Sequence, residues 1–266
     1  MVGDAGGQDG YPGPHSLAGS PSDADLRRWH PVAGAVLVIA SLVPPLSTLA
    51  RRYLFVESLQ FSLFAMVCPA LIVLGAPRRL LDRLAATQDR GSPFLRGLVF
   101  LVVFIGVSLA WRVPPVLDAL ARHPGLVAAE VITLLAAGIG LWLWLVRPAP
   151  LASRLSGAQR AVIAALAMWS TWIAAYAFGF STQPLVHAYA GGSGPGIVAD
   201  QEIAVFLVWG VAGVCFIPVI FAGLLSWLRD SGDIGEEFSR AYPDASVRVG
   251  VRGWPRPPRG PGARSG

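Results

Sequence analysis

Long apolar stretches alternate with short polar ones along the chain, at roughly 32–50, 53–75, 94–111, 125–146, 158–180 and 203–228. Each approaches or exceeds the ~20 residues that a helix needs to cross a hydrocarbon layer of ~30 Å. Pro44 and Pro45 lie near the end of the first stretch, so we expect that helix to kink or stop there. The pattern predicts an all-α membrane protein, a bundle of about six transmembrane helices.

The segments around these stretches have a different character. Residues 1–29 and 229–266 are rich in Gly, Pro, Ser and charged residues, which predicts disordered tails on either side of a six-helix domain at 30–228. Two loop segments, 78–87 and 113–125, alternate leucines with polar residues. Such amphipathic pieces are expected to lie at the membrane surface.

Composition and charge support this interpretation. The chain has 266 residues, of which 54% are hydrophobic and only 14% charged, below the quarter typical of soluble domains. All 21 basic residues are arginines, and 17 fall on one side of the predicted membrane against 4 on the other. Because cytoplasmic segments carry the excess of basic residues, both termini are predicted to be cytoplasmic. The arginines flank the spans and form no patch, which argues against a nucleic-acid partner.

A few polar residues interrupt the predicted spans near one side of the membrane. Glu57 and Gln60 lie one helical turn apart at the start of the second span, and Glu130 lies near the start of the fourth. An ionisable residue inside a membrane helix is costly and usually faces a partner or a cavity. Orientation places these residues in the outer leaflet, together with two pairs from other span ends, Trp111-Arg112 and Asp200-Gln201.

Each candidate also has a simpler interpretation. Glu57 and Glu130 could reach headgroups or water, Arg112 could extend to the interface, and Asp200 could cap its own helix. The cytoplasmic half of the spans shows no matching ladder of ionisable groups, which disfavours a transporter.

Other residues that could bind a metal are weaker candidates. Met66 and Cys68 carry sulfur ligands that suit Cu(I), but they lie two residues apart on a helix and are expected to pack in the core. His123 and His187 fall in predicted loops and are expected to be solvated.

Four segments resemble the CtaG-type cytochrome c oxidase assembly factors over about residues 35–228. They are the LIVLGAP end of the second span, the Trp111-Arg112-Val113-Pro114 step, the AAEVITLLAAGIGLWLWLV span and the Asp200-Gln201 pair. The resemblance implies a polytopic protein that delivers copper to the catalytic subunit of the oxidase or helps it mature. It also implies histidines on the outer side of the family's spans.

This sequence departs from the family pattern at those histidines. It has Glu57-Ser58-Leu59-Gln60-Phe61, Trp111-Arg112 and Glu130-Val131 where the pattern places imidazoles, although Gln60, Trp111, Pro114, Glu130, Asp200 and Gln201 match it. We therefore predict no metal or other cofactor, with copper possible only through the resemblance. In place of a metal site we expect an ion-pair cluster of Arg112 with Glu57 and Glu130, since a guanidinium pairs well with carboxylates at low dielectric.

The resemblance thus implies a non-enzymatic assembly or maturation factor for cytochrome c oxidase in a bacterial plasma membrane. Its partners would be the lipid bilayer and the catalytic subunit of the oxidase or its assembly intermediates. The sequence shows no nucleophile–base set, phosphate-binding loop or hydrolase motif. Two alternatives stay open at this point: an accessory subunit that docks to a respiratory complex, and a small-solute transporter or channel.

Overall fold

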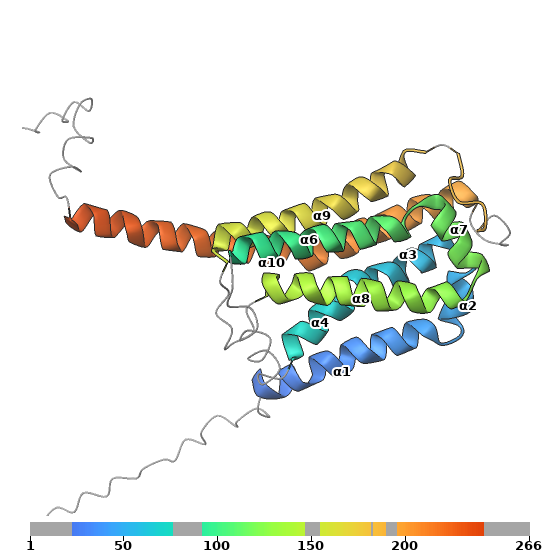
Figure 1. Ribbon diagram of the computed structural model, residues 1–266, viewed down its shortest axis with the longest axis horizontal. Helices are drawn as coiled ribbons and strands as arrows, with labels where there is room; N and C mark the ends of the chain where they lie inside the picture. The colour runs from blue at the N-terminus through green and yellow to red at the C-terminus, as the bar shows by residue number, and fades with distance from the viewer. Residues whose placement is uncertain (1–22, 77–91, 147–154, 182, 190–195, 242–266) are drawn as a thin grey trace, which may run out of the picture.

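The apolar stretches form helices that run side by side along one axis (Figure 1). A computed structural model describes residues 23–76, 92–146, 155–181, 183–189 and 196–241. Helix is the only regular secondary structure in this described part of the chain. The predicted all-α fold is therefore confirmed.

The elements follow the predicted order. The first apolar stretch gives α1 (Asp23–Leu42) and the short α2 (Leu46–Ala50), and the second gives α3 (Leu54–Ser62), the π-helix η1 (Leu63–Val67) and α4 (Cys68–Gly75) without interruption. The remaining elements are α6 (Pro93–Trp111), α7 (Pro114–Arg122), α8 (Gly125–Leu145), α9 (Gly157–Gly179) and α10 (Ile197–Ala241).

Five of these helical units are long and apolar enough to span a membrane, and Trp29–Leu42 of α1 is a shorter apolar helix beside them. Five candidate spans and this shorter helix are roughly consistent with the prediction of about six transmembrane helices. As predicted, the first helix ends just before Pro44 and Pro45. The amphipathic segment 113–125 forms α7, whereas its predicted counterpart at 78–87 lies outside the described residues.

The predicted ends of the outermost helices are wrong. The last helix was expected at 203–228 but runs from Ile197 to Ala241, and the first already begins at Asp23. Parts of both predicted tails, 23–29 and 229–241, are therefore helical. Neither segment is strongly apolar, so hydrophobic patterning alone could not detect that the helices continue.

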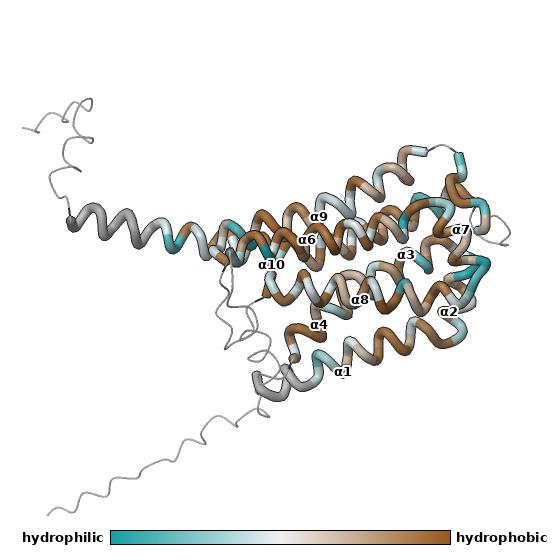
Figure 2. The backbone as a smooth tube through the Cα atoms, in the orientation of Figure 1, coloured by the Kyte–Doolittle hydropathy of each residue, from teal (hydrophilic) through white to brown (hydrophobic). Residues whose placement is uncertain are grey.

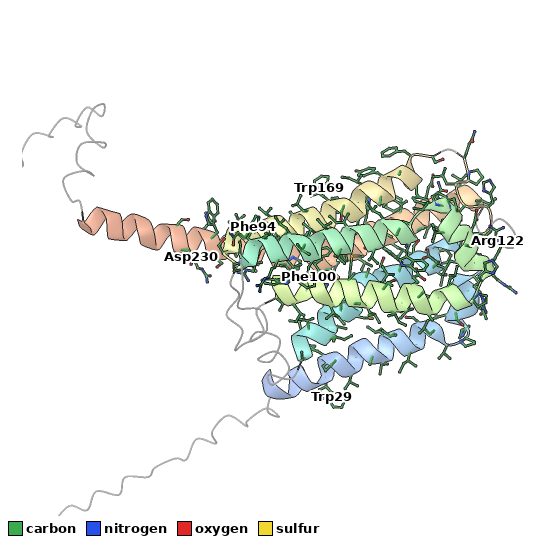
Figure 3. All side chains as sticks on the ribbon, in the orientation of Figure 1. Trp29, Phe94, Phe100, Arg122, Trp169 and Asp230 are labelled. Carbon is green, nitrogen blue, oxygen red and sulfur yellow. The ribbon has the colours of Figure 1, made fainter. Side chains whose placement is uncertain are left out.

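The first and last helices leave the bundle at the same end, as the six-crossing topology requires (Figure 1). The opposite end is formed by α2, α7, the start of α10 and the segment 183–189, and we call it the α7 end. Backbone colouring by hydropathy shows brown helices along the bundle with teal segments near α2 and α7 (Figure 2). Large apolar side chains such as Trp29 and Trp169 project away from the bundle, as expected for surfaces facing lipid (Figure 3).

The second span lies at the centre of the bundle and is the most buried of the candidate spans. Its α4 part packs on α1 and α8, and its α3 part packs on α10. Around it, α10 also packs on α9, and α6 packs on α8 and α9. Buried aromatic rings fill the core, with Trp142 stacked on Phe216 at 5.5 Å between ring centroids.

The second span contains a π-turn that the sequence did not predict. The Cys68 amide donates to the carbonyl of Leu63, five residues earlier, where an α-helix would use the fourth. Pro69 follows directly and has no N–H to donate to the Ala65 carbonyl. Helix α8 approaches closely at this position, because Gly138 presents no side chain to Ala65 and Pro69.

We expect Gly138→Ala to destabilise the protein by about 1–3 kcal/mol, the usual effect of overpacking a core. A Cβ at this position would lie 2.5 Å from the Ala65 carbonyl oxygen and 2.5 Å from Pro69 Cγ. The matched control is Gly106→Ala on α6, where a Cβ would meet nothing within 4 Å. SDS titration in mixed micelles measures the free energy of unfolding of both variants. Equal stability of Gly138→Ala and Gly106→Ala would contradict the close approach of α8 to the second span.

Candidate functional site

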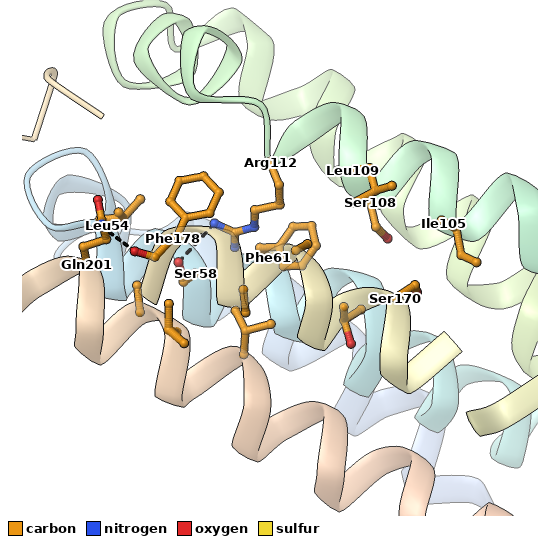
Figure 4. A pocket seen from close by; sticks show the side chains of 16 residues that line it. Leu54, Ser58, Phe61, Ile105, Ser108, Leu109, Arg112, Ser170, Phe178 and Gln201 are labelled. Atoms are coloured by element: carbon orange, nitrogen blue, oxygen red, sulfur yellow. Dashed lines mark hydrogen bonds between the residues drawn. The ribbon is translucent and has the colours of Figure 1, made fainter. Parts of the chain in front are cut away.

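Arg112 and Glu57 form an ion pair inside the α7 end of the bundle. Arg112 Nη1 lies 2.8 Å from Glu57 Oε2. It also lies 3.0 Å from the hydroxyl of Ser58, and the guanidinium lies 4.0 Å from the centre of the Phe61 ring (Figure 4). Only 11% of the Arg112 side chain and 5% of the Glu57 side chain are exposed. The ion pair expected between these residues is present.

Local sequence explains how both side chains reach this place. Helix α6 ends at Trp111 and α7 begins at Pro114, so the intervening Arg112 and Val113 form a tight corner. Val113 is extended, the conformation favoured before a proline. On the other side, Glu57 lies in the first turn of α3, where the helix dipole favours a carboxylate.

Glu130 on α8 lies near this pair, but the predicted salt bridge between Glu130 and Arg112 does not form among the described residues. Its side chain is buried, and its carboxyl interacts electrostatically with both Glu57 and Arg112. We call Glu57, Arg112 and Glu130 the ion-pair cluster. It contains two carboxyls and one guanidinium in a buried environment, so the positive charge of Arg112 can offset only one of two carboxylates.

Gln60 and Trp111, also predicted as site residues, link neighbouring helices instead of joining the ion-pair cluster. Gln60 Nε2 donates to the carbonyl of Ser41 near the end of α1, at 2.5 Å. Trp111 Nε1 donates to the Thr133 hydroxyl on α8, at 2.9 Å. Both bonds hold the α7 end together around the cluster.

Asp200 and Gln201 satisfy the ends of two other helices. The carboxylate of Asp200 accepts from the amides of Leu54 and Phe55, both at 2.8 Å, and so caps the N-terminus of α3. Gln201 donates to the carbonyl of Phe178 in the last turn of α9, at 2.6 Å, and accepts from the Leu185 amide.

The alternative in which Asp200 caps its own helix is therefore wrong, because α10 begins three residues before it, at Ile197. Asp200 instead fixes the first turn of α3, the turn that carries Glu57. It is a positioning residue for the ion-pair cluster.

Three residues of this region were missed from the sequence. Ser58 bonds to Arg112, and Asp118 on α7 accepts from the Ala188 amide at 2.7 Å. Tyr189 is buried beside the cluster, and its burial, together with the nearby Glu57 carboxyl, raises the pKa of its phenol. Asp118 could have been identified, because it lies on the polar face of the amphipathic segment 113–125. Tyr189 could not, because the segment that carries it has no periodic pattern.

The donors assembled here do not fit copper. Cu(I) prefers thiolate, thioether or imidazole ligands, whereas the cluster offers two carboxyls next to a cationic guanidinium. Met66 and Cys68 are fully buried in the core, and His123 and His187 are exposed. No group of three or more His, Cys, Asp or Glu side chains able to hold a metal occurs among the described residues.

Comparison with protein families gives a match over most of the chain. The family described as cytochrome c oxidase caa3 assembly factor (Caa3_CtaG) matches residues 22–230. The chain belongs to this family. The matched region begins at α1, ends within α10 and includes every candidate residue discussed above.

Membership of the CtaG family confirms the resemblance drawn from the four segments. It assigns the protein to the membrane-embedded assembly factors of cytochrome c oxidase, which interact with the oxidase or its assembly intermediates. No curated protein and no solved structure matches the chain in the same comparisons.

Proposed function

We propose that this protein assists maturation of the oxidase's catalytic subunit, or of an intermediate containing it, without catalysing a reaction itself. The family match over residues 22–230 is the observation that carries this proposal. The proposed location is a bacterial plasma membrane. The α7 end faces the extracytoplasmic side, since the arginine excess lies on the opposite side of the predicted spans.

The distribution of buried charge supports an outer-face role over transport. Three of the four buried charged side chains among the described residues, Glu57, Glu130 and Asp200, belong to the α7 end. Arg160 is buried near the opposite end of α9. Charges gathered at one end suit recognition of an extracytoplasmic partner better than a path through the membrane.

Deletion of the gene tests the proposed role. We expect membranes of the deletion strain to lose most of the assembled oxidase, measured as its haem absorption and as oxygen uptake. Restoring the wild-type gene should restore both signals. An accessory subunit would in addition co-purify with mature oxidase at a fixed ratio, whereas an assembly factor would not. Normal oxidase content after deletion would contradict both roles.

Copper content tests the nature of the site. We expect the purified protein to retain well below one equivalent of copper after exposure to Cu(I) and desalting, because the ion-pair cluster lacks soft ligands. Metal analysis of the wild type and Glu57→Ala measures this. Near-equimolar copper that disappears in Glu57→Ala would show that the cluster is a metal site after all.

A further inference from the structure

A cavity of ≈200 Å³ lies at the α7 end and is distinct from the pocket of Figure 4, with which it shares no lining residue. Glu57 lines the cavity, whereas its partner Arg112 lines the pocket of Figure 4. Glu130 forms another part of the cavity wall, and the exposed Arg51 lies at its rim. The two partners of the ion pair therefore line different pockets, and both carboxyls of the cluster line the same one.

The cavity wall carries two buried carboxyl oxygens to which no N–H or O–H of the described residues donates. Glu57 and Glu130 are each 4% exposed, their Oε1 atoms accept no bond from any other described residue, and the two carboxyls lie within hydrogen-bonding reach of each other. Gln60, on the same wall, already donates through Nε2 to the Ser41 carbonyl. Buried acceptors without donors are costly, so the wall suits a ligand with several N–H groups.

The charges of the ion-pair cluster also favour a ligand with a positive group. Two carboxyls share one guanidinium in the cluster, and like charges held close together at low dielectric repel strongly. Arg112 can offset only one of the two carboxyls when both are ionised, so a second positive group inside the cavity would allow both to be ionised and paired. Arg51 stands at the rim, but no bond from it to either carboxyl is present in the described structure.

We propose that this cavity binds one guanidinium group that enters from the α7 end. A guanidinium is planar, carries five N–H donors and is only weakly hydrated, so it can bridge oxygens of two buried carboxylates. The volume suffices, since a water molecule occupies ~30 Å³ in the liquid and the cavity is several times larger. A metal ion suits the site less well because only two carboxyls are present.

The proposal does not depend on a role in oxidase assembly, because purified full-length protein alone tests it. Calorimetric titration in lipid nanodiscs would use two probes: free N-acetyl-arginine amide, and a short peptide with a central arginine. We expect saturable one-to-one binding. Tetramethylammonium, a cation without N–H donors, should neither bind nor compete at equal ionic strength.

Matched variants connect the binding to the cavity. Glu130→Gln removes a charge at nearly constant shape and should weaken binding at least ~10-fold, as for loss of a charged hydrogen-bond partner. Glu202→Gln, at an exposed position in the first turns of α10, should leave binding unchanged. Ala121→Phe fills the cavity from α7 without altering either carboxyl, and it should abolish binding even if Glu130→Gln proves unstable.

The two probes show whether the guanidinium group belongs to a protein partner or to a small molecule. Binding of the peptide as well as the free amide would support an arginine side chain of a protein partner, and binding of the amide alone would support a small molecule. Failure of both probes to bind would overturn the proposal. Equal binding in wild type and Ala121→Phe would do the same, as would displacement by tetramethylammonium. These results would leave the deletion experiment unaffected.

Discussion

We expect Arg112→Ala to lower the free energy of unfolding by about 3–5 kcal/mol, the usual result of removing one partner from a buried ion pair. The loss arises because the Glu57 carboxylate would remain buried without its 2.8 Å contact to a guanidinium. The contact between the guanidinium and the Phe61 ring would also disappear. SDS titration in mixed micelles measures the change.

A double-mutant cycle separates the ion pair from simple loss of packing. Glu57→Gln in the Arg112→Ala background removes the unpaired carboxylate, so the double variant should recover much of the stability that Arg112→Ala loses. Arg122→Ala is the matched control, since Arg122 lies exposed at the same end and, among the described residues, donates only to the Asp118 carbonyl of its own helix. Additive effects of the two substitutions would show that the residues are not coupled.

We expect Asp200→Ala to destabilise the protein by about 2–4 kcal/mol, because it removes two charge-assisted hydrogen bonds that cap α3. The amides of Leu54 and Phe55 would lose their acceptor, and Leu54 is buried. Fraying of this first turn would move Glu57 away from Arg112. Loss of stability should therefore be accompanied by loss of the coupling between Arg112 and Glu57.

Two substitutions control this prediction. Asp200→Asn keeps one side-chain oxygen as an acceptor and should cost less than Asp200→Ala. Glu202→Gln, two residues further along α10 and exposed, should leave stability within about 0.5 kcal/mol of wild type. If Asp200→Ala and Glu202→Gln gave the same unfolding curve, the cap between α10 and α3 would make no contribution.

Much of the fold could be predicted because a bilayer imposes strong constraints on length and hydrophobicity. The six apolar stretches, the break before Pro44 and Pro45, and α7 all follow from local pattern. The π-turn at Leu63–Val67 could not be predicted, because it depends on how Pro69 and Gly138 meet across two helices. The continuation of α10 to Ala241 was also missed, since its last part is polar.

The candidate site was predicted only in part, for a related reason. A charged residue in an apolar stretch is visible in the sequence, and that signal identified Glu57 and Glu130 together with Arg112 at a span end. Pairing of Asp200 with the start of α3 spans 146 positions in sequence and depends on how α10 packs on α3. Tyr189 joins the cluster through a segment without periodicity, so its burial could be seen only in the structure.

The most direct test is the oxidase content of membranes in which the Arg112→Ala/Glu57→Gln double variant replaces the wild-type protein. It shows whether the ion pair is needed for oxidase assembly or only for the stability of the fold. The double variant should be present at near wild-type amounts, because it recovers much of the stability that Arg112→Ala loses. We predict that the haem absorption of assembled oxidase nevertheless falls to the level of the deletion strain. Wild-type oxidase content with the double variant would contradict a functional role for the ion-pair cluster.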